Sequence, residues 1–147
     1  MNATDVALER FDQKYSCSQA VFSALAELRG IDRDLAFRIA AGFGGGLARS
    51  GRTCGCVTGG MMAIGLAQRS VSPEDNRSER EKTYQKVQQF LRDFTERNGS
   101  TACLDLLGCD ISTPQGLEHA RQSGLFQSRC TKLVRDAVAL IEGLLRE

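Results

Sequence analysis

The sequence predicts an all-α fold, a compact single-domain bundle of about seven or eight helices. Apolar residues recur at helical spacing along almost the whole chain, and no run of alternating apolar and polar residues predicts a strand. The length of 147 residues fits one ordinary domain. No linker or internal repeat divides the chain, so residues 1–147 are expected to form one helical cysteine-motif domain.

Three helices are expected before the middle of the chain. Apolar positions in residues 6–11 indicate a short first helix, and residues 20–28 carry the spacing of a second one. Gly30 then follows as a stop signal. Asp32 can cap a third helix that runs to about Ala41.

A glycine-rich segment, Gly42–Gly46, interrupts this pattern and predicts irregular backbone, because glycine is costly in a helix. A helix is expected to resume near Cys54 and to run to about Gln68. Inside it, Gly55 and Gly59 lie four residues apart on one stripe. Small residues on one face predict that another helix packs closely against this one.

A long helix should follow Ser72-Pro73, which has the form of a cap followed by a proline at the first helical position. It should run to about Arg97, with Tyr84 and Phe90 on its buried face. Three further helices are expected: one ending at Leu107, one opened by Thr113-Pro114, and one over Cys130–Leu145.

Charge and hydropathy exclude several functional classes. Nineteen Lys and Arg residues balance eighteen Asp and Glu residues, which argues against a nucleic-acid or membrane-surface partner. The polar N-terminus has no apolar core typical of a signal peptide. The longest apolar stretch, 54–67, is too short to span a bilayer. The chain is therefore expected in the cytoplasm.

The six cysteines are the main indication of function, because several cysteines in a reducing compartment favour redox chemistry or metal binding. Four of them fall in the expected first turns of four different helices: Cys17, Cys54, Cys103 and Cys130. Unpaired N–H groups and the partial positive charge of a helix start stabilise a thiolate and lower its pKa. Cys56 lies just inside the same helix as Cys54, whereas Cys109 is interpreted as a buried small hydrophobe.

The leading hypothesis is a thiol–disulfide redox protein, in enzyme terms a thiol–disulfide oxidoreductase, which requires no cofactor. Cys54 would attack first, because Arg49 and Arg52 flank it and would lower its pKa or hold an anionic substrate. The mixed disulfide would be resolved by one of four other cysteines: Cys17, Cys56, Cys103 or Cys130. The partner would be a redox protein or a thiol substrate, and a homo-oligomer is compatible with the sequence.

Two other hypotheses stay open. In the first, a zinc ion or an iron–sulfur cluster is held by four ligands: Cys17, Cys54, Cys103 and Cys130. In the second, the chain is a structural or partner-binding helical protein with inert thiols. Neither disulfide connectivity nor the roles of Cys56, Cys109 and the Gly44–Gly46 loop follow from the sequence, because four cysteines alone allow three pairings.

The chain resembles the C_GCAxxG_C_C family of bacterial and archaeal proteins, which is described as redox-active. The match rests on Cys17 in Tyr-Ser-Cys-Ser-Gln-Ala, on the core Cys54-Gly55-Cys56-Val57-Thr58-Gly59, and on Cys103 and Cys130. Cys56 stands where the family pattern has alanine, and Cys109 is additional. The resemblance implies a redox role for the four shared thiols and names no substrate.

Overall fold

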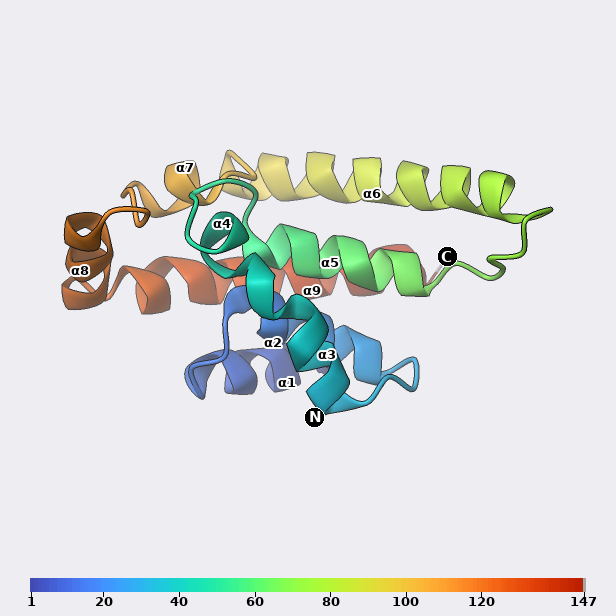
Figure 1. Cartoon of the computed structure of the whole chain (residues 1–147), viewed down its shortest axis with the longest axis horizontal. Helices are drawn as coiled ribbons and strands as arrows, with labels where there is room; N and C mark the ends of the chain where they lie inside the picture. Colours follow the sequence, from blue (N-terminus) through green and yellow to red (C-terminus); the bar gives the residue numbers. More distant parts are fainter. Residues whose placement is uncertain (147) are drawn as a thin grey trace.

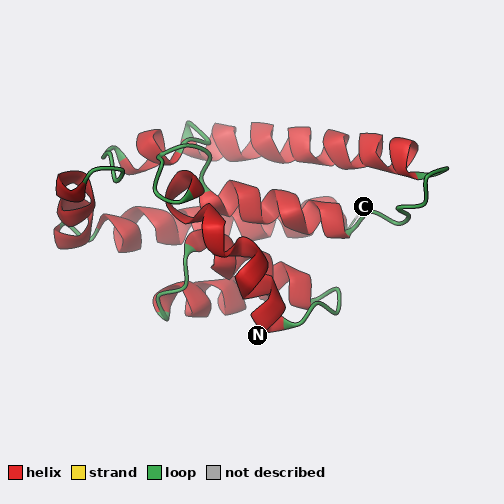
Figure 2. Ribbon diagram, in the orientation of Figure 1, coloured by secondary structure: helices red, strands yellow, loops and turns green. Residues whose placement is uncertain are grey.

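The computed structural model describes residues 1–146, and within them all regular secondary structure is helical (Figure 2). Nine α-helices and two short helical segments follow one another in these residues. They are α1 (Ala3–Asp12), α2 (Cys17–Glu27), α3 (Arg33–Ala40), a 3-10 turn (Ala41–Phe43), α4 (Gly44–Leu47), α5 (Gly55–Leu66), α6 (Asn76–Asn98), α7 (Cys103–Leu107), α8 (Pro114–Gln122), a π-helical segment (Phe126–Cys130) and α9 (Thr131–Leu145). The predicted all-α fold is confirmed.

The longer helices are arranged in three layers (Figure 1). Helices α5 and α9 contact each other in the central layer, and α6 packs against both of them from one side. Helices α1 and α2 cover the other side, and α3 lies against α2. Short helices α4, α7 and α8 gather at the end of the bundle where α5 and α9 begin (Figure 1). This end holds the candidate site.

Several helix starts are capped by side chains, and two of these caps, at Asp32 and Thr113, were predicted. The Ser16 side chain and Gln19 form a reciprocal capping box at the start of α2. Asp32 accepts a hydrogen bond from the Leu35 amide at the start of α3. Thr113 caps α8 in the same way, with Pro114 in the first turn. These caps fix the residue at which each helix begins.

The start of α6 differs from the prediction. The helix begins at Asn76, and Ser72-Pro73 belongs to a preceding turn. The hydroxyls of Ser70 and Ser72 both donate to the Asp75 carboxylate, so the serine organises the turn rather than capping the helix. Within residues 1–146, none of the helices combines the length and hydropathy that crossing a bilayer requires.

The core lies between α6 and the central pair of helices. Phe90 and Phe94 of α6 have no exposed surface, and their rings meet edge to face at 6.0 Å. Ile64 of α5 and Ile141 of α9 fill the same region. Tyr84, expected on the buried face, is instead 50% exposed.

Two glycines of α5 should respond oppositely to alanine. A Cβ at Gly60 would lie 2.8 Å from the buried Phe90 ring, so Gly60→Ala should lower the free energy of unfolding by about 1–2 kcal/mol. Gly65 has open space around it, so Gly65→Ala should raise that free energy by about 0.5–1 kcal/mol. Urea unfolding under reducing conditions measures both changes. Equal effects of the two substitutions would contradict this packing.

Candidate functional site

Four cysteines from distant parts of the chain line one cavity of about 690 Å³. They are Cys17, Cys54, Cys103 and Cys130. Cys56 lies behind the cavity wall and is fully buried. Cys109 is outside this group, and its thiol donates a hydrogen bond to the Gly116 carbonyl at 3.2 Å. The structure therefore brings together the residues predicted for the site, while their chemical roles remain predictions.

The tightest part of the site is a sulfur cluster formed by Cys17, Cys54 and Cys56. Their Sγ atoms all lie within 4.8 Å of one another. Cys17 is the first residue of α2, Cys54 is the N-cap of α5, and Cys56 lies in the first turn of α5. The cluster is thus formed where the N-termini of two helices meet.

Glycine allows these helix ends to meet. A Cβ on Gly55 would lie 2.5 Å from Cys17 Sγ and 3.0 Å from the Ser18 amide nitrogen. One turn later, a Cβ on Gly59 would lie 3.0 Å from the Ser18 carbonyl oxygen. Any larger side chain at these positions would push α2 away from α5. The predicted close packing along this glycine stripe is confirmed, and it places the Cys17 sulfur.

Backbone hydrogen bonds tie the Cys54 segment to the Cys103 segment. Thr53 and Ala102 form an isolated antiparallel bridge. The Cys54 amide donates to the Thr101 carbonyl at 2.8 Å, and the Cys103 amide donates to the Arg52 carbonyl at 2.6 Å. These bonds hold two cysteines, 49 residues apart in sequence (103 − 54), on neighbouring walls of the cavity.

The glycine-rich segment, which includes the short α4, makes a left-handed turn beside the cluster and is not regular α-helix. Five consecutive residues, 45–49, have positive φ angles. A Cβ on Gly46 would lie 2.6 Å from the Arg52 amide nitrogen and 2.7 Å from the Cys103 Cβ, so glycine is required there. The turn directs the Gly45 amide toward Cys17. The irregular backbone predicted for this segment therefore contributes directly to the site.

The cluster favours one thiolate, on Cys17. Hydrogen bonds from the Cys54 and Cys56 thiols, with further bonds from the Gly45 and Ser18 amides, hold the pKa of Cys17 well below its ordinary value against the effect of burial. The Cys54 pKa is raised well above the ordinary value, chiefly by its hydrogen bond to Cys17. Burial raises the pKa of Cys56. One negative charge is therefore concentrated at the sulfur that begins α2.

The remaining two thiols of the cavity are protonated at neutral pH. Burial, helped by the charge on Cys17, raises the pKa of Cys103 to about 11. The same causes, together with Cys103, raise the pKa of Cys130 to about 12. The expectation that helix starts activate all four cavity thiols is therefore wrong for these two.

The position of Cys130 also differs from the prediction. It was expected to open the last helix, but it ends the π-helical segment Phe126–Cys130, which continues into α9. Cys130 consequently lies inside a continuous helical stretch and lacks the unpaired N–H groups of a helix start. The low pKa expected at Cys54 is also wrong, because neighbouring thiols and burial determine it, rather than Arg49 or Arg52.

Three thiols in one place also form a set of soft metal ligands. Sulfur atoms this close could jointly bind a thiophilic ion such as zinc. This set contains Cys56, which the four-ligand hypothesis from the sequence omitted. The two-residue spacing of Cys54 and Cys56 at a helix start was the available signal, because both side chains then lie at one end of α5.

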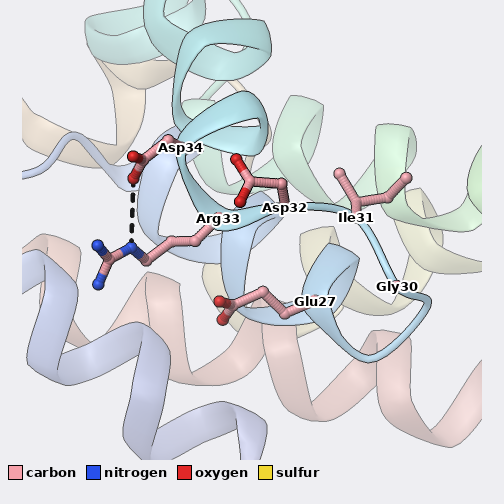
Figure 3. A pocket seen from close by; sticks show the side chains of 6 residues that line it. All are labelled: Glu27, Gly30, Ile31, Asp32, Arg33 and Asp34. Atoms are coloured by element: carbon pink, nitrogen blue, oxygen red, sulfur yellow. Dashed lines mark hydrogen bonds and ion pairs between the residues drawn. The ribbon is translucent and has the colours of Figure 1, made fainter.

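A second hollow, of about 670 Å³, lies between the end of α2 and the start of α3 (Figure 3). Its acidic residues serve the fold. Glu27 pairs with Arg10, Asp32 caps α3, and Asp34 lies 3.4 Å from the Arg33 guanidinium. No cysteine lines this hollow. The cavity beside the cysteines is the candidate functional site.

Comparisons with known proteins agree with this emphasis on cysteines. Residues 15–144 match the family described as "Putative redox-active protein (C_GCAxxG_C_C)". A protein of Archaeoglobus fulgidus named "Uncharacterized protein" is 32% identical over 106 residues, which is 68% of this chain and 70% of that relative. No solved structure gives a significant match.

The single-thiolate arrangement can be measured by absorbance at 240 nm during a pH titration. The wild-type protein should show a thiolate that forms below the ordinary cysteine pKa of about 8.5. Cys17→Ser/Cys54→Ser should remove this early transition, because burial is the first cause that raises the pKa of the site thiols that remain, Cys56, Cys103 and Cys130. Cys54→Ser alone should keep the transition, because Cys17 and its amide donors remain. Cys109→Ser should leave it intact. An early transition that survives Cys17→Ser/Cys54→Ser, or one that is lost in Cys54→Ser alone, would contradict the assignment.

Gly55→Ala tests the contact between the helix ends. The new Cβ would displace Cys17 from the start of α5 and weaken the hydrogen bonds from its neighbours. We expect the Cys17 pKa to rise by about 1 or more, as expected when hydrogen bonds to a charged form are lost. Gly65→Ala, on the same helix but in open space, is the matched control and should leave the pKa unchanged.

Proposed function

The chain belongs to the C_GCAxxG_C_C family, and we propose that it acts as a thiol–disulfide redox protein in which Cys17 is the attacking thiolate. The observation that carries the proposal is the cluster of three sulfurs within 4.8 Å, with its one thiolate at a cavity wall. Thiolates attack disulfides, whereas thiols do not. The cytoplasmic location expected from the sequence suits such chemistry, because reduced thiols persist there.

In the first step, the Cys17 thiolate attacks one sulfur of a substrate disulfide. A bond forms between Cys17 Sγ and that sulfur, the substrate S–S bond breaks, and the second substrate sulfur leaves as a thiolate that takes a proton. The sequence favoured Cys54 for this role. The proposal assigns it to Cys17, because Cys17 has the lowered pKa and the converging hydrogen bonds.

The second step follows from the loss of charge on Cys17. The Cys17 thiolate is the first cause that raises the Cys54 pKa, whereas the Cys56 thiol and amide lower it. Once Cys17 is bound in a mixed disulfide, its charge is gone and only the influences of burial and Cys56 remain. Cys54 can then lose its proton and attack Cys17 Sγ, which releases the first substrate sulfur. An intramolecular Cys17–Cys54 disulfide results.

The two steps oxidise two protein thiols and reduce one substrate disulfide to two thiols. An external dithiol would return the protein to its reduced state by the reverse exchange. Cys56 donates to the cluster from the buried side and acts as a positioning residue in this scheme. Cys103 and Cys130 stay protonated on the cavity wall at neutral pH.

The second candidate function is metal binding. It is favoured by the same three sulfurs, because Cys17, Cys54 and Cys56 lie close enough to share one ion. Cys103 and Cys130 line the adjoining cavity and are available for a larger cluster, as the four-ligand hypothesis supposed. Iron, zinc or a brown colour in anaerobically purified protein would support this candidate over thiol exchange.

The exchange mechanism predicts a stoichiometry with dithiobis(nitrobenzoate). One equivalent added to the reduced, metal-free protein should release two thionitrobenzoate ions in a fast phase, as the second attack follows the first. Cys17→Ser/Cys54→Ser should slow the first release by about tenfold or more, because burial keeps the pKa of Cys56, Cys103 and Cys130 raised in this variant. Cys54→Ser should delay the second release and accumulate the mixed disulfide.

Cys109→Ser is the matched control, since Cys109 lies outside the cavity lining. Its two releases should match those of the wild-type protein, and mass spectrometry should locate the new disulfide between Cys17 and Cys54. Wild-type rates in Cys17→Ser/Cys54→Ser, or slow reaction of all six thiols in the wild-type protein, would contradict thiol exchange at this site.

A further inference from the structure

The cavity beside the cysteine cluster has the dimensions of a small-molecule site. Its volume of about 690 Å³ lies within the range of about 300–1,000 Å³ typical of ligand pockets. Its walls come from α1, α2, the glycine-rich turn, α7, α8 and α9, so the hollow is enclosed by several elements. A substrate in this cavity would therefore contact residues from several helices.

Much of the cavity lining is hydrocarbon. Leu107, Ile111 and Leu133 line the cavity and are nearly fully buried. The full apolar set on α7, α8, α9 and their connections is Leu106, Leu107, Ile111, Leu117, Phe126 and Leu133. Such a lining favours an apolar body in the ligand, because burying hydrocarbon there removes it from water.

The charged residues of the lining all have one sign. Lys14, Arg49 and Arg121 line the cavity and are exposed at its rim. Among residues 1–146, none of these three cations forms an ion pair, and no Asp or Glu lines the cavity. The whole chain has a net charge of only +1, so this local excess does not reflect the composition. It favours an anionic ligand.

We infer that the cavity binds a small organic disulfide with a hydrocarbon body and an anionic end-group such as a carboxylate. The inference rests on the proposed function for the disulfide, while the hydrocarbon and the anion follow from the walls and the rim. The charge on Cys17 repels the anionic end and leaves the neutral S–S bond to approach the sulfur cluster. The end-group then lies toward Lys14, Arg49 and Arg121.

Binding without redox chemistry tests the ligand class on its own. Octanoate has the hydrocarbon body and the carboxylate but no sulfur, and octanol lacks the charge. Calorimetry on the reduced wild-type protein should detect octanoate binding at least about tenfold tighter than octanol binding, as three rim cations would provide. The triple variant Lys14→Gln/Arg49→Gln/Arg121→Gln should lose this preference.

The matched control removes the same number of charges elsewhere. Arg29, Arg38 and Arg135 are exposed and lie outside the cavity lining. The variant Arg29→Gln/Arg38→Gln/Arg135→Gln should keep the octanoate preference of the wild-type protein. A loss of equal size in both triple variants would show a general effect of net charge and would overturn the assignment of the rim.

Reduction of matched disulfides tests the same preference in the reaction. Dithiodihexanoate, whose hydrocarbon arms end in carboxylates, should react at least about tenfold faster than its neutral diamide, with the difference removed in the rim variant. Hydroxyethyl disulfide, which is neutral and short, should react more slowly than dithiodihexanoate.

The two assays separate the ligand class from the proposed function. Octanoate binding without any disulfide reduction would contradict thiol exchange and support the proposed ligand class. Equal reduction of all three disulfides, without octanoate binding, would overturn the ligand class and keep thiol exchange. Preference for a protein disulfide over every small disulfide, again without octanoate binding, would likewise overturn it in favour of a macromolecular partner.

Discussion

The N-termini of α2 and α5 meet at Gly55, where a hydrogen atom occupies the position that a side chain would need beside the Cys17 sulfur. A Cβ there would lie 2.5 Å from Cys17 Sγ. Because the helix ends meet, three thiols occupy one small volume, and the amide groups of both ends point toward it. Gly59 supports the same contact one turn later in α5. A Cβ there would lie 3.0 Å from the Ser18 carbonyl oxygen of α2. Without this approach, the cysteines would be separate thiols in a helical bundle.

The left-handed turn is the second backbone feature on which the site depends. Residues 45–49 have positive φ angles, and three of them, Leu47, Ala48 and Arg49, are not glycine. Each such residue costs about 1–2 kcal/mol, so the turn persists only because other interactions offset the cost. Hydrogen bonds from the amides of Arg49, Gly51 and Arg52 back to the carbonyls of residues 44–46 close the loop. The same loop supplies the Gly45 amide to Cys17, so the strained backbone lies where the thiolate needs a donor.

Local signals in the sequence predicted much of this arrangement. Asp32 and the Thr113-Pro114 pair indicated helix starts, and the stripe at Gly55 and Gly59 indicated the close packing. Tertiary features could not be predicted in this way. The π-helical segment carries Cys130 into a continuous helix, and the Gly45 amide reaches Cys17 only through long-range hydrogen bonds. The cysteines that form the site could therefore be predicted from the sequence. Which of them has the lowered pKa could not, because that depends on contacts between distant segments.

The charge balance of the cluster connects its chemistry to the cavity. Three thiols this close cannot all ionise, because like charges repel strongly where water is largely excluded. The first thiolate is stabilised by its neighbours' protons, and it raises the pKa of Cys54, Cys56, Cys103 and Cys130 in turn. When Cys17 forms a bond, that one charge disappears, and its contribution to the raised pKa of each neighbouring thiol disappears with it. The cavity has two parts, the singly charged sulfur cluster and the cationic rim. A substrate matches both parts when it places a neutral group at the sulfurs and a negative charge at the rim. The same arrangement that orders the two chemical steps thus also selects how a ligand must lie.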